Sequence, residues 1–143
     1  IRKYEHAIDY WVSEKDLGIY DAFNKAVKLA MGEYYIVIGC DDVLFVDSIE
    51  SLINSNDRLK KAEADYVVAA MYLGEKFSRG MHPSLGWLGA QSMVTGHSVG
   101  MLIKTKVHSL LGLYSTRYRL ASDALFIKHL FASQFEGIES DII

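Results

Sequence analysis

Two adjacent carboxylates, Asp41 and Asp42, follow the apolar run of residues 34–38 after two small residues. Ligands of open α/β sheets bind just outside the carboxyl ends of the strands, which is where a strand over this run would place the pair. Neighbouring carboxylates repel each other unless a cation lies beside them, and Mg²⁺ is usually held by one or two carboxylates together with substrate phosphates. The pair therefore predicts a metal-bridged diphosphate. The alternative is a turn in which an aspartate caps the next helix, and two aspartates by themselves favour this structural role.

The composition is that of an ordinary globular domain. The chain has 143 residues, of which 50% are hydrophobic and 23% are charged, so we expect a single domain over residues 1–143. The net charge of -3 gives no sign of the basic patch that nucleic-acid binding requires. The single cysteine, Cys40, excludes an intrachain disulfide and a cysteine-based zinc cluster. No apolar run is long enough to span a bilayer.

Hydrophobic periodicity predicts the elements that would position the carboxylates. Apolar residues at three-to-four spacing predict a helix over 16–32, with Asp16 as its N-cap and Gly32 at its end. Buried strands are predicted over 33–39 and 64–73, separated by a helix over 47–62 that Asp47 or Ser48 caps. A short strand is also predicted earlier, over 6–14.

The second half of the chain begins with a long Gly- and Ser-rich loop over 74–96. Loops of this length in compact domains are often functional. A strand over 97–105, a short helix over 106–114, a helix over 121–133 and a final strand over 135–140 follow it. The alternation of helices and strands predicts an α/β sheet with crossover helices.

Four stretches taken together carry a family resemblance. They are "SEKDLGIYDAFNKAVKLAMGEY", "GCDD", "GHSVGMLIK" and "GLYSTRYRLASD". Their order resembles the family-2 glycosyltransferases, above all bacterial members that build surface polysaccharides. The resemblance covers nearly the whole chain and implies a partial GT-A (Rossmann-like) mixed sheet flanked by helices. Family members begin with a strand of the "sIItptyN" type and a further acidic strand end. Neither precedes Ile1, so we expect the middle and C-terminal part of a catalytic domain.

The resemblance implies an inverting transfer of a sugar from a nucleotide-diphospho-sugar, such as a UDP-sugar, to a glycan or lipid-linked acceptor. It also implies a cytoplasmic enzyme, peripheral at the inner membrane face. Asp42 would bind a divalent cation, Mg²⁺ or Mn²⁺, and Asp41 would be a second ligand or lie nearer the ribose. The fuller family pattern is acidic two residues earlier, where this chain has Gly39, so a site of three carboxylates is not expected.

Asp123 matches the position of the family's general base. An acceptor hydroxyl is a weak nucleophile unless its proton is removed as the new bond forms, and a carboxylate can remove it. At the start of the last predicted helix, the helix dipole would favour the anionic form of Asp123. The alternative is a first-turn carboxylate with a structural role. His97 matches a family histidine that would contact the leaving diphosphate or the acceptor, and its alternative role is packing.

The first predicted helix faces the nucleotide in the family. We therefore expect Asp21, Asn24 and Lys25, on the polar side of this helix, to contact the donor, with Lys25 meeting a phosphate as a point charge. The alternative is a solvated helix face. Glu14 and Asp16 precede the helix at positions that are also acidic in the family.

Two further groups of residues could meet substrate. Arg79, His82 and Trp87 belong to the long loop, where a basic and an aromatic side chain could contact phosphate or sugar. Tyr118 and Arg119 would border the acceptor site.

Two rival functions remain open. A nucleotidyltransferase of related fold usually carries a Gly-rich basic loop near its N-terminus, and the region where this loop would lie is absent here. A non-catalytic fragment that cannot hold the donor would expose a sheet edge and apolar surface, which favours pairing between chains. We therefore expect a homo-oligomer, a dimer or larger.

Overall fold

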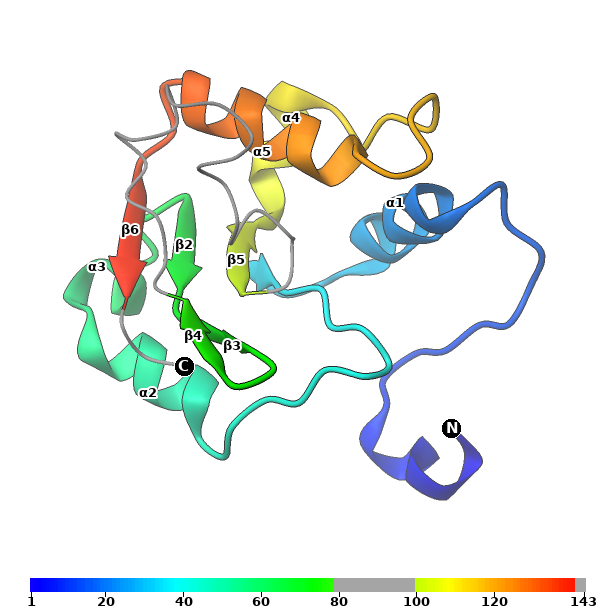
Figure 1. The fold of residues 1–143 in the computed structure, drawn as a ribbon, viewed down its shortest axis with the longest axis horizontal. Helices are drawn as coiled ribbons and strands as arrows, with labels where there is room; N and C mark the ends of the chain where they lie inside the picture. Colours follow the sequence, from blue (N-terminus) through cyan, green and yellow to red (C-terminus); the bar gives the residue numbers. More distant parts are fainter. Residues whose placement is uncertain (79–99, 141–143) are drawn as a thin grey trace.

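The computed structural model describes residues 1–78 and 100–140, which form a mixed sheet flanked by helices (Figure 1). The strand order is β1 (Tyr34–Tyr35), β5 (Met101–Lys104), β2 (Tyr66–Ala69) and β6 (Gly137–Ser140). β5 is antiparallel to both β1 and β2, whereas β6 is parallel to β2. The predicted α/β class with a mixed, helix-flanked sheet is confirmed.

Helices cover both faces of this sheet (Figure 1). On one face lie α1 (Ile19–Leu29), η4 (Thr105–Val107), α4 (His108–Leu111) and α5 (Ser122–Ala132). On the other face lie α2 (Ser48–Ser55) and α3 (Asp57–Lys60). Successive side chains of a strand point to opposite faces, so Tyr66 and Val68 join the first core while Val67 and Ala69 join the second. All four residues of β2 are buried, which makes it the centre of the fold.

A short hairpin extends β2 beyond the sheet. β3 (Met71–Leu73) pairs antiparallel with β4 (Lys76–Ser78), so part of the predicted loop over 74–96 is a strand. The chain turns at Gly74, which has a φ of 61°.

The predicted strand over 6–14 is wrong. Residues 2–7 form the 3₁₀ helix η1 (Arg2–Ala7), and the segment up to Gly18 has little regular structure. Ile8 is extended, with φ −118° and ψ 117°, but a strand also needs a neighbour to pair with. Figure 1 shows this segment extending away from the sheet, and residues 1–19 are exposed.

Two other predicted elements are shorter or divided. The strand over 33–39 is reduced to Tyr34 and Tyr35, because only these two residues pair with β5. The helix over 47–62 is interrupted at Asn56, whose side chain accepts a hydrogen bond from the Arg58 N–H at 2.9 Å and so starts α3. Asp47 precedes α2 in the left-handed region, with φ 59°, and makes no side-chain cap bond.

The start of α1 also differs from the prediction. Gly18, not Asp16, is the N-cap, and its φ of 125° and ψ of 172° lie in a region that is essentially restricted to glycine. Asp16 instead accepts a hydrogen bond from the Gly18 N–H at 2.9 Å, which fixes the turn before the helix.

Candidate functional site

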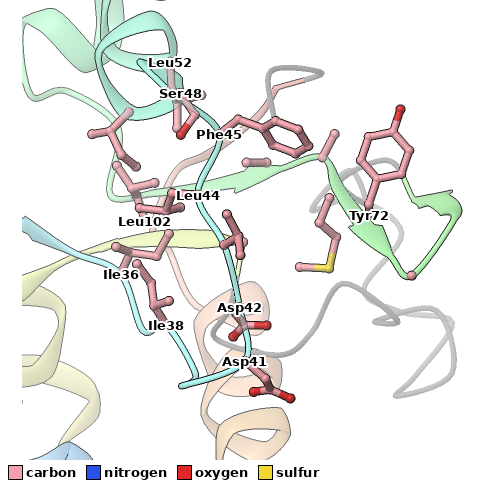
Figure 2. A pocket seen from close by; sticks show the side chains of 17 residues that line it. Ile36, Ile38, Asp41, Asp42, Leu44, Phe45, Ser48, Leu52, Tyr72 and Leu102 are labelled. Carbon is pink, nitrogen blue, oxygen red and sulfur yellow. The ribbon is translucent and has the colours of Figure 1, made fainter.

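A pocket of about 810 Å³ adjoins the turn that carries Asp41 and Asp42 (Figure 2). It lies between the loop after β1, the start of α2 and the end of β2. Most of its walls are apolar, with Ile36, Leu44 and Phe45 among the residues that Figure 2 labels. An apolar cleft with a few polar groups at one end is the usual form of a small-molecule site.

Both carboxylates of the turn lie close to Gly39. The Gly39 N–H donates a hydrogen bond to Asp42 Oδ2 at 2.6 Å, and the Asp42 N–H donates to the Gly39 carbonyl at 3.3 Å. A Cβ atom added at Gly39 would lie 2.8 Å from Asp42 Oδ2 and 3.1 Å from Asp41 Oδ1. The absence of a side chain at position 39 therefore leaves room for the two carboxylates to lie on the same side of the turn, as Figure 2 shows.

This pair fits a hard divalent cation in donor chemistry. Two exposed carboxylates supply the oxygen ligands that Mg²⁺ and Mn²⁺ accept, and such ions commonly complete their shell with phosphate and water. Within the described residues, no group of three or more His, Cys, Asp or Glu side chains could hold a metal ion. The hydrogen bond from Gly39 to Asp42 is also the kind of local contact that a structural turn makes.

Ser48 is an unexpected member of the same pocket. The residue is only 8% exposed, and within the described part of the chain its Oγ has no hydrogen-bond partner. A buried hydroxyl without a partner is costly, so this atom is available to a ligand or a water molecule in the pocket. The sequence indicated Ser48 only as a helix cap.

Asp123 lies in the first turn of α5, as predicted, and its partner is Tyr20 of α1. The Tyr20 hydroxyl donates a hydrogen bond to Asp123 Oδ1 at 2.6 Å. Burial of the ring, followed by the hydrogen bond to Asp123, raises the pKa of Tyr20 above its ordinary value. Sequence reasoning missed Tyr20, although its spacing from Val27 places both on the buried face of the helix.

A second pocket, of about 560 Å³, lies beside this pair. It is formed by the turn before α1 and by the loop that precedes α5, and its walls include Tyr20, Asp21, Tyr118 and Arg119. The Leu17 N–H donates to Asp21 Oδ2 at 3.0 Å, and this bond, with help from the nearby Lys25, lowers the pKa of Asp21. The structure thus brings Asp21, Tyr118 and Arg119 together next to the tyrosine that holds Asp123.

Lys25 lies in neither of these pockets. Its Nζ is 2.6 Å from Glu14 Oε1 and 3.4 Å from Asp21 Oδ2. The pKa of Lys25 is raised, and the hydrogen bond to Glu14 is the main cause. Lys25 and Glu14 line a groove of about 860 Å³ between α1 and the N-terminal segment.

Asn24 does not lie on the polar side of α1, where the sequence pattern placed it. It is buried, with 7% exposure, and its amide bonds the main chain of Tyr114 through both polar atoms. Asn24 follows Tyr20 by four residues, so both side chains lie on the inner face of α1. The sequence pattern assigned Asn24 to the outer face because asparagine is polar.

Other predicted residues lie outside the described residues, namely His97 and the loop residues Arg79, His82 and Trp87. A different histidine, His108, is half-buried at the start of α4 and stacks on Phe126. Its Nδ1 lies 2.9 Å from the Gly112 carbonyl, so Nδ1 carries the proton and Nε2 accepts from the Tyr35 hydroxyl at 2.7 Å. Burial lowers the pKa of His108.

Comparisons with known proteins agree with the sequence pattern. A family model described as "Glycosyl transferase family 2" matches residues 1–131. A comparison with curated proteins found no match. Within residues 1–78 and 100–140, no helix combines the length and the apolar character needed to cross a bilayer.

Proposed function

The chain belongs to glycosyl transferase family 2, and we propose that it serves an inverting transfer of a sugar from a nucleotide-diphospho-sugar to a glycan or lipid-linked acceptor. The family supports glycosyltransferase activity and, with the mixed sheet, a GT-A type fold. The donor class, for which we propose UDP-sugars, rests on the resemblance described above. A cytoplasmic location at the inner membrane face, where lipid-linked acceptors are found, is part of the same proposal.

The observation that carries the proposal is the carboxylate pair at the end of the 810 Å³ pocket. We assign Asp42, with Asp41, to a divalent cation, Mg²⁺ or Mn²⁺, and the pocket to the donor. When bound, the cation would neutralise the diphosphate and make it a better leaving group. The turn at Gly39 holds the two carboxylates on one side, which supports their use as a pair.

We assign the general-base role to Asp123. The acceptor oxygen forms its bond to the anomeric carbon on the face opposite the diphosphate, the carbon–oxygen bond to the diphosphate breaks, and the acceptor proton passes to the Asp123 carboxylate. The bonding electrons leave with the nucleoside diphosphate. The pocket lined by Tyr20, Tyr118 and Arg119 supports an acceptor position on this side of α1.

The donor contacts predicted for Asp21, Lys25 and His97 remain part of the proposal. Asp21 and Lys25 are joined by an ion pair. Neither lines the pocket assigned to the donor, so they would meet a part of the donor that extends beyond that pocket toward α1. Asn24, with both amide atoms bonded to Tyr114, would act by holding α1 in place rather than by direct contact.

Calorimetric titration of UDP in the presence of Mn²⁺ tests the metal–diphosphate site. We expect metal-dependent binding that Asp42→Asn and Asp41→Asn weaken about tenfold or more, because each removes one ligand charge. Asp47→Asn is the matched control, since it removes a charge from the same loop outside the pocket lining. Absence of metal-dependent UDP binding would contradict the proposed role of the pair. Release of UDP from a UDP-sugar, rather than of pyrophosphate from UTP, separates glycosyl transfer from nucleotidyl transfer.

Self-association is a second proposal, and one feature favours it. The apolar residues of the loop before α2 are exposed, with Val43 at 86% and Val46 at 90%. Apolar surface of this kind favours association between chains. Light scattering at high protein concentration should detect a dimer or larger species, and a monomer would contradict it.

A further inference from the structure

We propose that Tyr20 is a positioning residue for Asp123, holding its carboxylate in place to take up the proton of the acceptor. The inference rests on the proposed function, because it concerns the residue that we assign as the general base. It concerns a pair of residues 103 positions apart, which no sequence motif connects.

The hydrogen bond between the two residues has the length of a strong, charge-assisted one. The Tyr20 hydroxyl lies 2.6 Å from Asp123 Oδ1, within the range typical of a hydroxyl donating to a carboxylate. A tyrosine hydroxyl has one proton to donate, and here it is directed at Asp123.

The ring of Tyr20 is fixed independently of Asp123. The residue is 6% exposed, and its ring packs edge-on against Phe23 and in a stacked arrangement with Tyr114, at centroid distances of 5.8 and 6.1 Å. One turn later, Asn24 ties the same helix to the main chain of Tyr114. The position of the hydroxyl is therefore set by the core.

The start of α5 is fixed from its own side. Ser122 is 1% exposed, and its Oγ donates to the Ser115 carbonyl at 2.5 Å. The Tyr20 hydroxyl meets the carboxylate of Asp123 at this N-terminus of α5.

The bond between Tyr20 and Asp123 lies where the acceptor proton would be transferred. Tyr20 lines the pocket assigned to the acceptor, so the carboxylate that it orients lies next to that pocket. As the acceptor oxygen bonds to the anomeric carbon and the diphosphate departs, the proton moves from the acceptor to Asp123. Fixing the carboxylate beforehand removes the need to order it during the reaction.

A structural tie between α1 and α5 is the competing explanation, and Tyr20→Phe separates the two. The matched control is Tyr34→Phe, which also removes one hydroxyl and one hydrogen bond, from Tyr34 to the Ala64 carbonyl at 2.5 Å. Tyr34 packs against the core on the opposite face of the sheet. The unfolding midpoint of each variant verifies that the protein is folded under the assay conditions.

The kinetic measurement is release of UDP from UDP-glucose, UDP-galactose and UDP-N-acetylglucosamine in turn, with Mn²⁺ and water as the acceptor. We expect Tyr20→Phe to lower kcat about tenfold with little change in the donor KM. Tyr34→Phe should leave both kcat and the donor KM unchanged. Asp123→Asn should lower kcat by about a hundredfold or more, as loss of a general base does.

A second measurement needs no turnover. The tyrosine ring carbon bearing the hydroxyl is labelled with ¹³C, and the titration of Tyr20 is followed by NMR. Asp123→Asn should lower the pKa of Tyr20, because the negative partner is removed, whereas Lys28→Gln on the outer face of α1 should not.

The outcomes separate the inference from the function on which it rests. If Asp123→Asn is inactive while Tyr20→Phe behaves like Tyr34→Phe, the positioning role is wrong and the base assignment stands. If Asp123→Asn keeps its activity, the base assignment fails and the positioning role with it. If Asp123→Asn leaves the pKa of Tyr20 unchanged, the pair is not formed in solution and the inference is overturned. Absence of turnover by the unmodified chain with all three donors contradicts both.

Discussion

The side chain of Asn24 forms two hydrogen bonds with the main chain of Tyr114, 90 residues further along the chain. Its Nδ2 donates to the Tyr114 carbonyl at 2.8 Å, and its Oδ1 accepts from the Tyr114 N–H at 2.9 Å. The amide side chain thus satisfies both the N–H and the carbonyl of Tyr114, as the backbone of a neighbouring strand would. This contact connects α1 to the segment between α4 and α5.

Asn24→Ala should therefore destabilise the fold by about 2–4 kcal/mol, because it leaves a buried N–H and a buried carbonyl without partners. Urea unfolding followed by circular dichroism measures the change in the free energy of unfolding. Lys28→Ala, at an exposed position of the same helix, is the control and should stay within about 0.5 kcal/mol. Equal effects of the two substitutions would contradict the structural role of Asn24.

Stability should fall in mildly acidic solution because of His108. Burial lowers its pKa in the folded state, so below its ordinary value of 6.5 the unfolded state binds a proton that the folded state excludes. The histidine contribution is therefore fully present above pH 6.5, and it declines as the pH falls until the folded-state pKa is passed. Protonation would also remove the acceptor that Nε2 offers to Tyr35.

Thermal unfolding of the unmodified chain and of His108→Gln between pH 5 and pH 8 checks this dependence. The decline below pH 6.5 should be smaller in His108→Gln, which cannot take up the proton. His129→Gln, at an exposed position of α5, should retain the full decline. A decline of the same size in all three proteins would show that other groups cause it.

Gly18→Ala should destabilise the chain by about 1–3 kcal/mol through the backbone alone. The added Cβ would meet no atom within 4 Å, so the cost comes from the φ of 125° that an L-residue rarely adopts. A D-alanine at position 18, introduced by ligation, fits this conformation and should restore most of the stability. If both residues destabilise equally in chemical denaturation, the cause is not the handedness of the backbone.

Ser48→Ala should raise the free energy of unfolding by about 1 kcal/mol, because it removes a buried hydroxyl without a partner. Ser51→Ala, at an exposed position of the same helix, corrects for the higher helix propensity of alanine. If Ser48→Ala is less stable than Ser51→Ala, the hydroxyl has a partner in solution, such as a bound water.

Sequence reasoning succeeded where a residue pattern determines its own structure. The apolar spacing of α1 and α5 and the β-branched run of β2 each specify an element with a buried side. The position of Asp123 at the start of α5 followed from the resemblance together with the helix pattern. The position of Asp41 and Asp42 at a turn was likewise predicted from the apolar run that precedes them.

The remaining features depend on partners that are distant in sequence. The segment over 6–14 reads as a strand, but it has no neighbouring strand in the described part of the structure. The sequence pattern predicts Asn24 to be a surface residue, because no neighbouring residue indicates that its amide will hydrogen-bond the main chain of Tyr114. The bond between Tyr20 and Asp123 likewise depends on how two helices pack. Contacts of this kind cannot be obtained from periodicity, which describes only one element at a time.

The place of β2 in the sheet has a consequence for how the chain is made. Both strands that flank β2, β5 and β6, come later in the sequence, and the contact between Asp65 and Glu136 spans 71 residues. A ribosome therefore releases β2, whose four residues are all buried in the finished fold, with both of its edges unpaired. Such non-local pairing slows folding and leaves apolar strands open to aggregation in the meantime. The nascent chain therefore exposes β2 until residues 137–140 have left the exit tunnel.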